Sequence, residues 1–317
     1  MTATAQRETN PANPLLGIAL KIISVTIFVG MSTFIKAAGQ LPAGQIVFFR
    51  SFFAIFPVLV FLAYRQELGT AIRTAHPFSH MARGIVGVAS MGFGFFALTR
   101  LPLPEAITIN YAQPLLVVVF SALFLGEVIR VYRWSAVVVG LVGVLIVSAP
   151  RLTLFSEAGA MGGQEMIGVL AALAAAAISA VAMHLVRKLV RTEKTATIVL
   201  WFSMTASAAA LFSVPFGWQA MTAMQALLLV SAGICGGVAQ IFMTEAYRHA
   251  EASTVAPFEY TSLILAIAVG YLVFGDAPTV YMLVGGAIVI GAGIFIVWRE
   301  QRLGLKREAA RKAAPPQ

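Results

Sequence analysis

Apolar residues arrive along the chain in blocks of about 20, which short polar segments separate. A helix of that length crosses the hydrocarbon core of a bilayer, which is about 30 Å thick. The pattern lacks the short alternating segments that are typical of transmembrane β-barrels. We therefore expect an all-α polytopic membrane protein with ten transmembrane helices. The expected spans are residues 15–37, 44–63, 81–99, 103–125, 133–149, 166–187, 197–216, 225–247, 253–274 and 280–298.

One part of this pattern occurs twice. The block 97–132 aligns with the block 246–281 without a gap when the sequence is shifted by 149 positions. Seven positions are identical, and they include the pair Tyr111 and Tyr260. Both copies run from a polar and aromatic cluster through an apolar stretch to a turn of glycine and an acidic residue. Because a repeat decides how a chain is divided, we expect two halves of five spans each.

The lysine and arginine residues predict how these halves are oriented. If the N-terminus is cytoplasmic, the cytoplasmic segments hold 17 of the 22 basic residues and the external segments hold 3, while Lys21 and Arg50 fall within spans. This distribution follows the positive-inside rule and favours a multi-pass protein with two cytoplasmic termini. Since five is an odd number, the second half enters the membrane with the opposite polarity, as in transporters built from inverted repeats.

The span count and the repeat divide the chain into five segments. They are a cytoplasmic N-terminal tail (1–14), a first repeat (15–149), an external linker (150–165), a second repeat (166–298) and a basic cytoplasmic tail (299–317). Basic clusters next to a membrane span commonly contact anionic lipid, so we expect the tail to lie against the bilayer surface.

Composition narrows the class of protein further. Hydrophobic residues make up 59% of the chain, the mean hydropathy is +0.88, and only 11% of residues are charged, against roughly 25% in a typical soluble domain. The net charge is +9, but the basic residues lie in loops and in the tail, so we expect no nucleic-acid partner. Cys235 is the only cysteine and the four histidines lack ligand spacing, so we expect no disulfide framework, metal site, cofactor or catalytic centre.

Ionisable residues inside spans are costly and usually face a cavity or a partner. Arg50 lies about two turns into the second span and cannot lose its charge. It requires a carboxylate, backbone carbonyls or an anionic group of a substrate, and the sequence leaves structural pairing and substrate contact equally open. Lys21 lies near the cytoplasmic end of the first span, where snorkelling of its ammonium to the interface is the simplest interpretation.

A polar cluster is expected in the second half, near the cytoplasmic side. Glu245 ends the eighth span, and Glu259 and Tyr260 lie about two turns into the ninth. The turn between these spans is short, so Glu259 and Tyr260 should lie at a depth similar to that of Gln240. Substrate contact is the role that we predict for this cluster, and Glu245 or Glu259 is the candidate carrier of a coupling proton.

The matching cluster of the first half holds Asn110, Tyr111, Gln113 and Pro114. By the inversion it should lie near the external side, so that the two clusters form opposite rims of one central pathway. The alternative is that the tyrosines only anchor helix packing through a hydroxyl hydrogen bond. Pro114 frees a backbone carbonyl and permits a bend that suits gating, or is simply a tolerated kink.

The duplicated block also carries a family resemblance. The sequences "NYAQP" at 110–114 and "LFLGE" at 123–127 resemble the EamA module of the drug/metabolite transporter superfamily. The run 246–276 is similar to a proteobacterial branch that includes the RibN-type riboflavin transporters and the S-adenosylmethionine uptake transporters. The resemblance covers the whole chain and implies two EamA-like modules of five helices each.

This resemblance implies uptake of a bulky, cofactor-like metabolite through the inner membrane by a secondary carrier. Riboflavin is the expected cargo, since a neutral, flat molecule rich in carbonyls and hydroxyls suits aromatic, Asn, Gln and Tyr side chains. S-adenosylmethionine, which is cationic, would favour the two glutamates. Export of amino acids or metabolites and facilitated diffusion stay open, and a membrane-embedded enzyme is the third class of function. The glycine-rich spans suit close helix packing or a homodimer.

Overall fold

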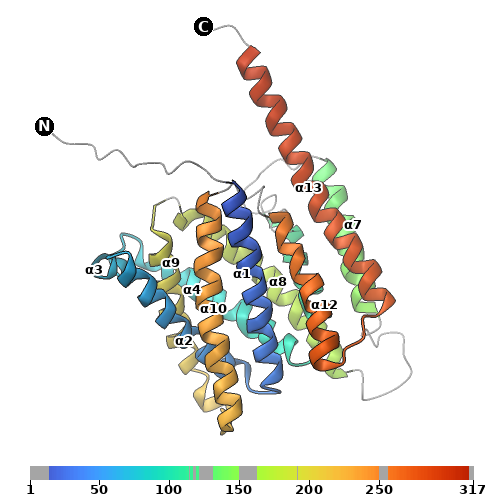
Figure 1. Cartoon of the computed structure of the whole chain (residues 1–317). Coiled ribbons are helices and arrows are strands. Elements are labelled where there is room, and N and C mark those ends of the chain that lie inside the picture. The colour runs from blue at the N-terminus through green and yellow to red at the C-terminus, as the bar shows by residue number, and fades with distance from the viewer. Residues whose placement is uncertain are drawn as a thin grey trace, which may run out of the picture.

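The computed structural model describes residues 14–113, 115–116, 119–120, 131–149, 163–190, 192–249 and 256–313, and every regular element within them is a helix. The longer helices pack side by side into a bundle (Figure 1). Their bounds are α1 Pro14–Ala37, α2 Ala43–Tyr64, α3 Leu68–Ala71, α4 Pro77–Leu98, α5 Leu103–Asn110, α7 Val131–Ser148, α8 Gly163–Val190, α9 Thr195–Leu211, η3 Val214–Phe216, α10 Ala223–His249, η4 Ala256–Tyr260, α12 Thr261–Phe274 and α13 Val280–Ala313.

Six of these helices are long and apolar enough to cross a bilayer: α1, α2, α4, α8, α10 and α13. Shorter apolar helices cover 134–148, 196–211 and 258–274, where the fifth, seventh and ninth spans are expected. Large apolar side chains such as Val60 and Leu272 are exposed on the bundle, as a lipid-facing surface requires. The chain is therefore a multi-pass helical membrane protein. The fourth expected span begins as α5 but continues beyond the described residues, so the total of ten stays a prediction.

The packing of the helices follows the sequence repeat. With the 149-residue shift, α1 corresponds to α8, α4 to α10, and α7 to α13. The helix α1 packs along α10, and correspondingly α8 packs along α4. The corresponding helices α7 and α13 pack against each other, as do α2 and α9. Two halves related by an approximate two-fold axis produce this arrangement.

The backbone departs from α-helical geometry at two corresponding positions. The helix α5 ends at Asn110 and Tyr111 lies in a turn, while the 3₁₀ helix η4 ends at Tyr260, where α12 begins. Tyr111 and Tyr260 are exact counterparts under the shift of 149. Irregular backbone within a membrane protein is tolerated where it faces protein or a cavity, and transporters place binding sites at such breaks.

The two ends of the described chain lie at the same end of the bundle, where α1 starts and α13 finishes (Figure 1). We refer to it as the terminal end. The apolar part of α13 stops at Arg299, but the helix continues through the basic segment to Ala313 and projects from the bundle.

Candidate functional site

The two positions where the backbone departs from α-helical geometry bring their tyrosines together. The rings of Tyr111 and Tyr260 lie with their centroids 5.1 Å apart and their planes at 75°, an edge-to-face geometry that aromatic pairs favour. The Tyr111 hydroxyl also shares a hydrogen bond with the hydroxyl of Ser262. Counterparts in two halves touch each other only near the axis that relates the halves. The tyrosine pair therefore marks the approximate two-fold axis.

The sequence predicts that Tyr111 and Tyr260 lie at opposite rims of the pathway. This prediction is wrong for the two side chains, because their rings are in contact and therefore lie at one depth. Asn110 is exposed on the bundle, and Gln113 and Gln240 are half-buried. Pro114 lies outside the described residues.

Glu259 forms an ion pair with Lys21 across the helices. The Lys21 Nζ atom lies 3.2 Å from Oε2 of Glu259, and the Lys21 side chain is only 1% exposed. The interpretation of Lys21 as a snorkelling residue is therefore wrong. One turn further along α1, Ser24 donates a hydrogen bond of 2.7 Å to the carbonyl of Ala239. Both α10 and the segment that holds Glu259 therefore contact this part of α1.

Arg50 does not pair with a carboxylate among the described residues; it shares an aromatic ring with a second arginine. Its Cζ lies 5.8 Å from the centroid of the Phe202 ring, and the Cζ of Arg83 lies 4.1 Å from the same centroid. Arg50 is 5% exposed. The buried Nε of each arginine, and Nη1 of Arg83, have no hydrogen-bond partner in the described structure. We refer to Arg50, Phe202 and Arg83 as the arginine pair site.

Two glycines make room for this site. A Cβ atom added to Gly87 would overlap Nη1 of Arg83 and lie 2.5 Å from Cε2 of Phe202. A Cβ added to Gly236 would lie 3.1 Å from Nε of Arg50. Gly87 and Gly236 are counterparts under the 149-residue shift. Each repeat therefore supplies one of the two glycines that leave space for the arginine side chains.

Sequence reasoning missed Arg83. The expected third span begins at residue 81, which makes Arg83 a charge at the cytoplasmic boundary. The helix α4 instead begins at Pro77, so Arg83 lies about two turns inside it. The repeat held a signal that could have identified Arg83. Gly84 and Gly233 are identical counterparts, but Arg83 is a charged residue at the position where the second repeat has the apolar Ala232.

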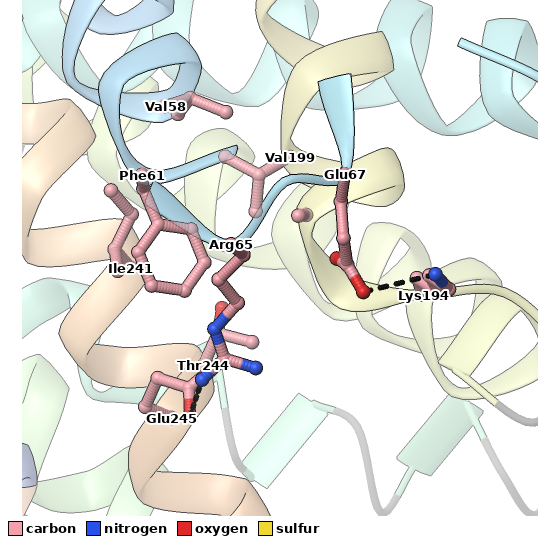
Figure 2. Close-up of a pocket in the computed structure, with 10 residues that line it drawn as sticks. Val58, Phe61, Arg65, Glu67, Lys194, Val199, Ile241, Thr244 and Glu245 are labelled. Carbon is pink, nitrogen blue, oxygen red and sulfur yellow. Dashed lines mark hydrogen bonds and ion pairs between the residues drawn. The ribbon is translucent and has the colours of Figure 1, made fainter. Parts of the chain in front are cut away.

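A pocket opens at the terminal end of the bundle, between the ends of α2, α9 and α10 (Figure 2). Ion pairs flank it: Nη2 of Arg65 lies 3.3 Å from Oε2 of Glu245, and Nζ of Lys194 lies 3.0 Å from Oε1 of Glu67. Glu245 and Glu259 form ion pairs with different helices, because Glu245 reaches toward α2 whereas Glu259 faces α1, and their grouping at one site stays a prediction. Val199, in the pocket wall, precedes Phe202 by about one helical turn.

Polar contacts join helices at the opposite end of the bundle. Nζ of Lys36 lies 3.2 Å from Oδ2 of Asp276 and donates a hydrogen bond of 2.9 Å to the carbonyl of Leu101. The Gln45 amide donates to the carbonyl of Gln219 at 2.9 Å and accepts from its backbone N–H at 3.2 Å. These contacts join both repeats at the end that lies away from the pocket.

Comparison with known proteins identifies the family. The model of the EamA-like transporter family matches residues 15–149 and 166–299. The chain is 30% identical to the pseudopaline exporter CntI of Pseudomonas aeruginosa, over 88% of this chain and 94% of the relative. It is 30% identical to a riboflavin transporter of Rhizobium johnstonii, over 91% and 90%. It is 25% identical to an S-adenosylmethionine uptake transporter of Rickettsia felis, over 91% and 94%.

A solved crystal structure supports the fold. It is 21% identical to this chain, covers 90% of it and 98% of its own length, and superposes with a TM-score of 0.61. The similarity in fold, the two matched segments and the transporters among the relatives agree with one another. The chain belongs to the EamA-like transporter family of the drug/metabolite transporter superfamily, and it is a transporter and not an enzyme.

Proposed function

We propose that this protein is a secondary carrier that moves a small organic metabolite across the bacterial inner membrane by alternating access, with both termini in the cytoplasm. The observation that carries the proposal is the contact between corresponding residues of the two halves at the axis. The axis lies between the end of the bundle with the pocket and the end with the Lys36 and Gln45 contacts. Tyr111 contacts Tyr260 there, and the pocket reaches within about one turn of Phe202. Carriers built from inverted repeats bind cargo at such a central interface.

The asymmetry between the two ends supports alternating access. The pocket opens at the terminal end, while the contacts of Lys36 and Gln45 close the other end. If the two halves exchange their conformations, the open and closed ends exchange as well. The structure then corresponds to the inward-facing state, and outward opening requires the Lys36–Asp276 and Gln45–Gln219 contacts to break.

Riboflavin is the cargo that the sequence favours, and the riboflavin transporter among the relatives supports testing it first. Aromatic rings are present at the axis, where a flat molecule can stack: Tyr111, Tyr260 and Phe202. Two alternatives are uptake of S-adenosylmethionine and export, since relatives with those names are similar over most of the chain. A homodimer stays a prediction.

Growth of a bacterial strain that cannot make riboflavin tests the cargo and the direction together. We expect the protein to permit growth at low external riboflavin and to accumulate labelled riboflavin in cells. The control is the Tyr111→Ala/Tyr260→Ala variant at equal membrane expression, in which rescue should be lost because both axis rings are gone. If the unaltered protein gives neither rescue nor uptake, riboflavin import is excluded. Labelled metabolites loaded into the same cells then test export.

A further inference from the structure

The arginine pair site holds two positive charges inside the bundle with no acidic side chain among the described residues to balance them. Both guanidinium groups lie near the centre of the Phe202 ring, Arg50 on α2 at 5.8 Å and Arg83 on α4 at 4.1 Å. Like charges repel strongly where water is excluded. Buried N–H donors without an acceptor are costly as well. An arrangement of this kind lowers stability unless a ligand completes it.

The surroundings are shaped around the arginines. Gly87 and Gly236 leave the space that the two side chains occupy. Phe202 presents its ring to both cations, which offsets part of their repulsion through cation–π attraction. Phe202 lies about one helical turn along α9 from Val199 in the pocket wall, so the arginine pair site lies close to the pocket.

We propose that the arginine pair site binds an acidic group of the cargo, a carboxylate or a phosphate, and that the cargo of this carrier is an organic acid. Guanidinium groups match both groups through paired N–H···O bonds. This inference rests on the proposed carrier function and assigns its cargo class. It ranks acidic metabolites above riboflavin, which carries no acidic group.

Binding to the purified protein tests this inference without requiring transport. We choose two matched pairs of probes: flavin mononucleotide with riboflavin, and phenylsuccinate with its neutral diamide. In chloride-free buffer, the acidic member of at least one pair should raise the melting temperature with increasing concentration. The neutral member should have a much smaller effect. Arg50→Met and Arg83→Met should weaken the apparent affinity for the acid by roughly tenfold or more.

The matched control is Arg100→Met. Arg100 also stacks on a phenylalanine, with its Cζ 3.5 Å from the Phe96 ring centroid, but it lies in the connection after α4. This variant should keep the response to the acids. Without ligand, Arg50→Met should melt no lower than the unaltered protein, because it removes one of two repelling charges. If Arg50 instead stabilised the fold, Arg50→Met would melt at a lower temperature than the unaltered protein. Arg50→Lys keeps the charge without the planar fork and should bind the acid weakly.

Four results would overturn the inference: equal shifts from acidic and neutral probes, no shift from either acid, unchanged binding in both methionine variants, or an equal shift from sodium chloride alone. The last result would assign the site to a structural counter-ion. Failure of the carrier function itself is distinguishable. In that case the acid binds through Arg50 and Arg83, but no labelled acid crosses the membrane of proteoliposomes.

Discussion

At the residue scale, the charges inside the bundle differ in whether the protein supplies a partner. Lys21 has Glu259 at 3.2 Å, and Lys36 has Asp276 at 3.2 Å. Arg50 and Arg83 have only the ring of Phe202 among the described residues. Arg50 could be predicted as exceptional from its place in an apolar block. Its contact with Arg83 could not, because it depends on how far α4 extends and on the tilt of two helices.

The Lys21–Glu259 pair leads to a prediction about stability. Glu259→Gln removes the carboxylate that lies 3.2 Å from the buried Lys21 ammonium. We expect this to cost about 1–2 kcal/mol of unfolding free energy, less than for a fully buried pair, because the Glu259 side chain is 49% exposed. Adding Lys21→Met should recover part of the loss, because it removes the buried charge that faced the carboxylate. Thermal unfolding of the single and double variants measures both effects.

The control for this pair is Glu67→Gln, which breaks the contact with Lys194 at the pocket mouth, where both side chains are partly exposed. Such pairs contribute about 0–1 kcal/mol. Equal losses in Glu259→Gln and Glu67→Gln, or no recovery in the double variant, would contradict a stabilising ion pair between Lys21 and Glu259.

At the element scale, the periodicity of the sequence predicts most helices because length and hydropathy decide which segments cross a bilayer. The bounds of α1 and α2 agree with the expected spans within a residue or two. The sequence predicts a bend at Pro114, three residues after Tyr111, but it does not predict the turn at Tyr111 or the 3₁₀ turn that ends at Tyr260. Tertiary contacts accompany both positions: Tyr111 bonds to Ser262, and Tyr260 packs on α13.

The packing of Tyr260 on α13 depends on one glycine. A Cβ atom on Gly293 would overlap the Tyr260 hydroxyl and lie 2.6 Å from Cζ. Gly293→Ala should therefore push Tyr260 away from Tyr111 and reduce the transport rate by roughly tenfold, as misplacement of positioned groups by about 1 Å can. Gly291→Ala is the control on the same helix, because a Cβ there meets nothing within 4 Å.

Transport by the two alanine variants at equal expression checks this prediction. Gly291→Ala should transport normally and melt at the same or a slightly higher temperature, since alanine favours a helix by up to about 1 kcal/mol. Normal transport in Gly293→Ala would show that the position of Tyr260 does not matter for the pathway.

At the scale of the whole molecule, the repeat in the sequence predicts two related halves. What it could not predict is which counterparts meet, because an alignment gives correspondence and not distance. Tyr111 and Tyr260 correspond and touch. Gly87 and Gly236 correspond and frame opposite arginines. The repeat could not predict the cargo either. The arginine pair site is not symmetric, because both arginines come from the first half and Phe202 comes from the second.

The central claim is that cargo crosses by alternate opening of the two ends, and a cross-link at the closed end tests it most directly. In a Cys235→Ala background, Gln45→Cys and Gln219→Cys place thiols where side chain and backbone now share two hydrogen bonds. A short thiol-reactive cross-linker should stop the transport of labelled riboflavin, or of the acid that binds best, and each single-cysteine variant should be unaffected. If the fully cross-linked protein transports at the rate of the untreated protein, the account of alternating access is contradicted.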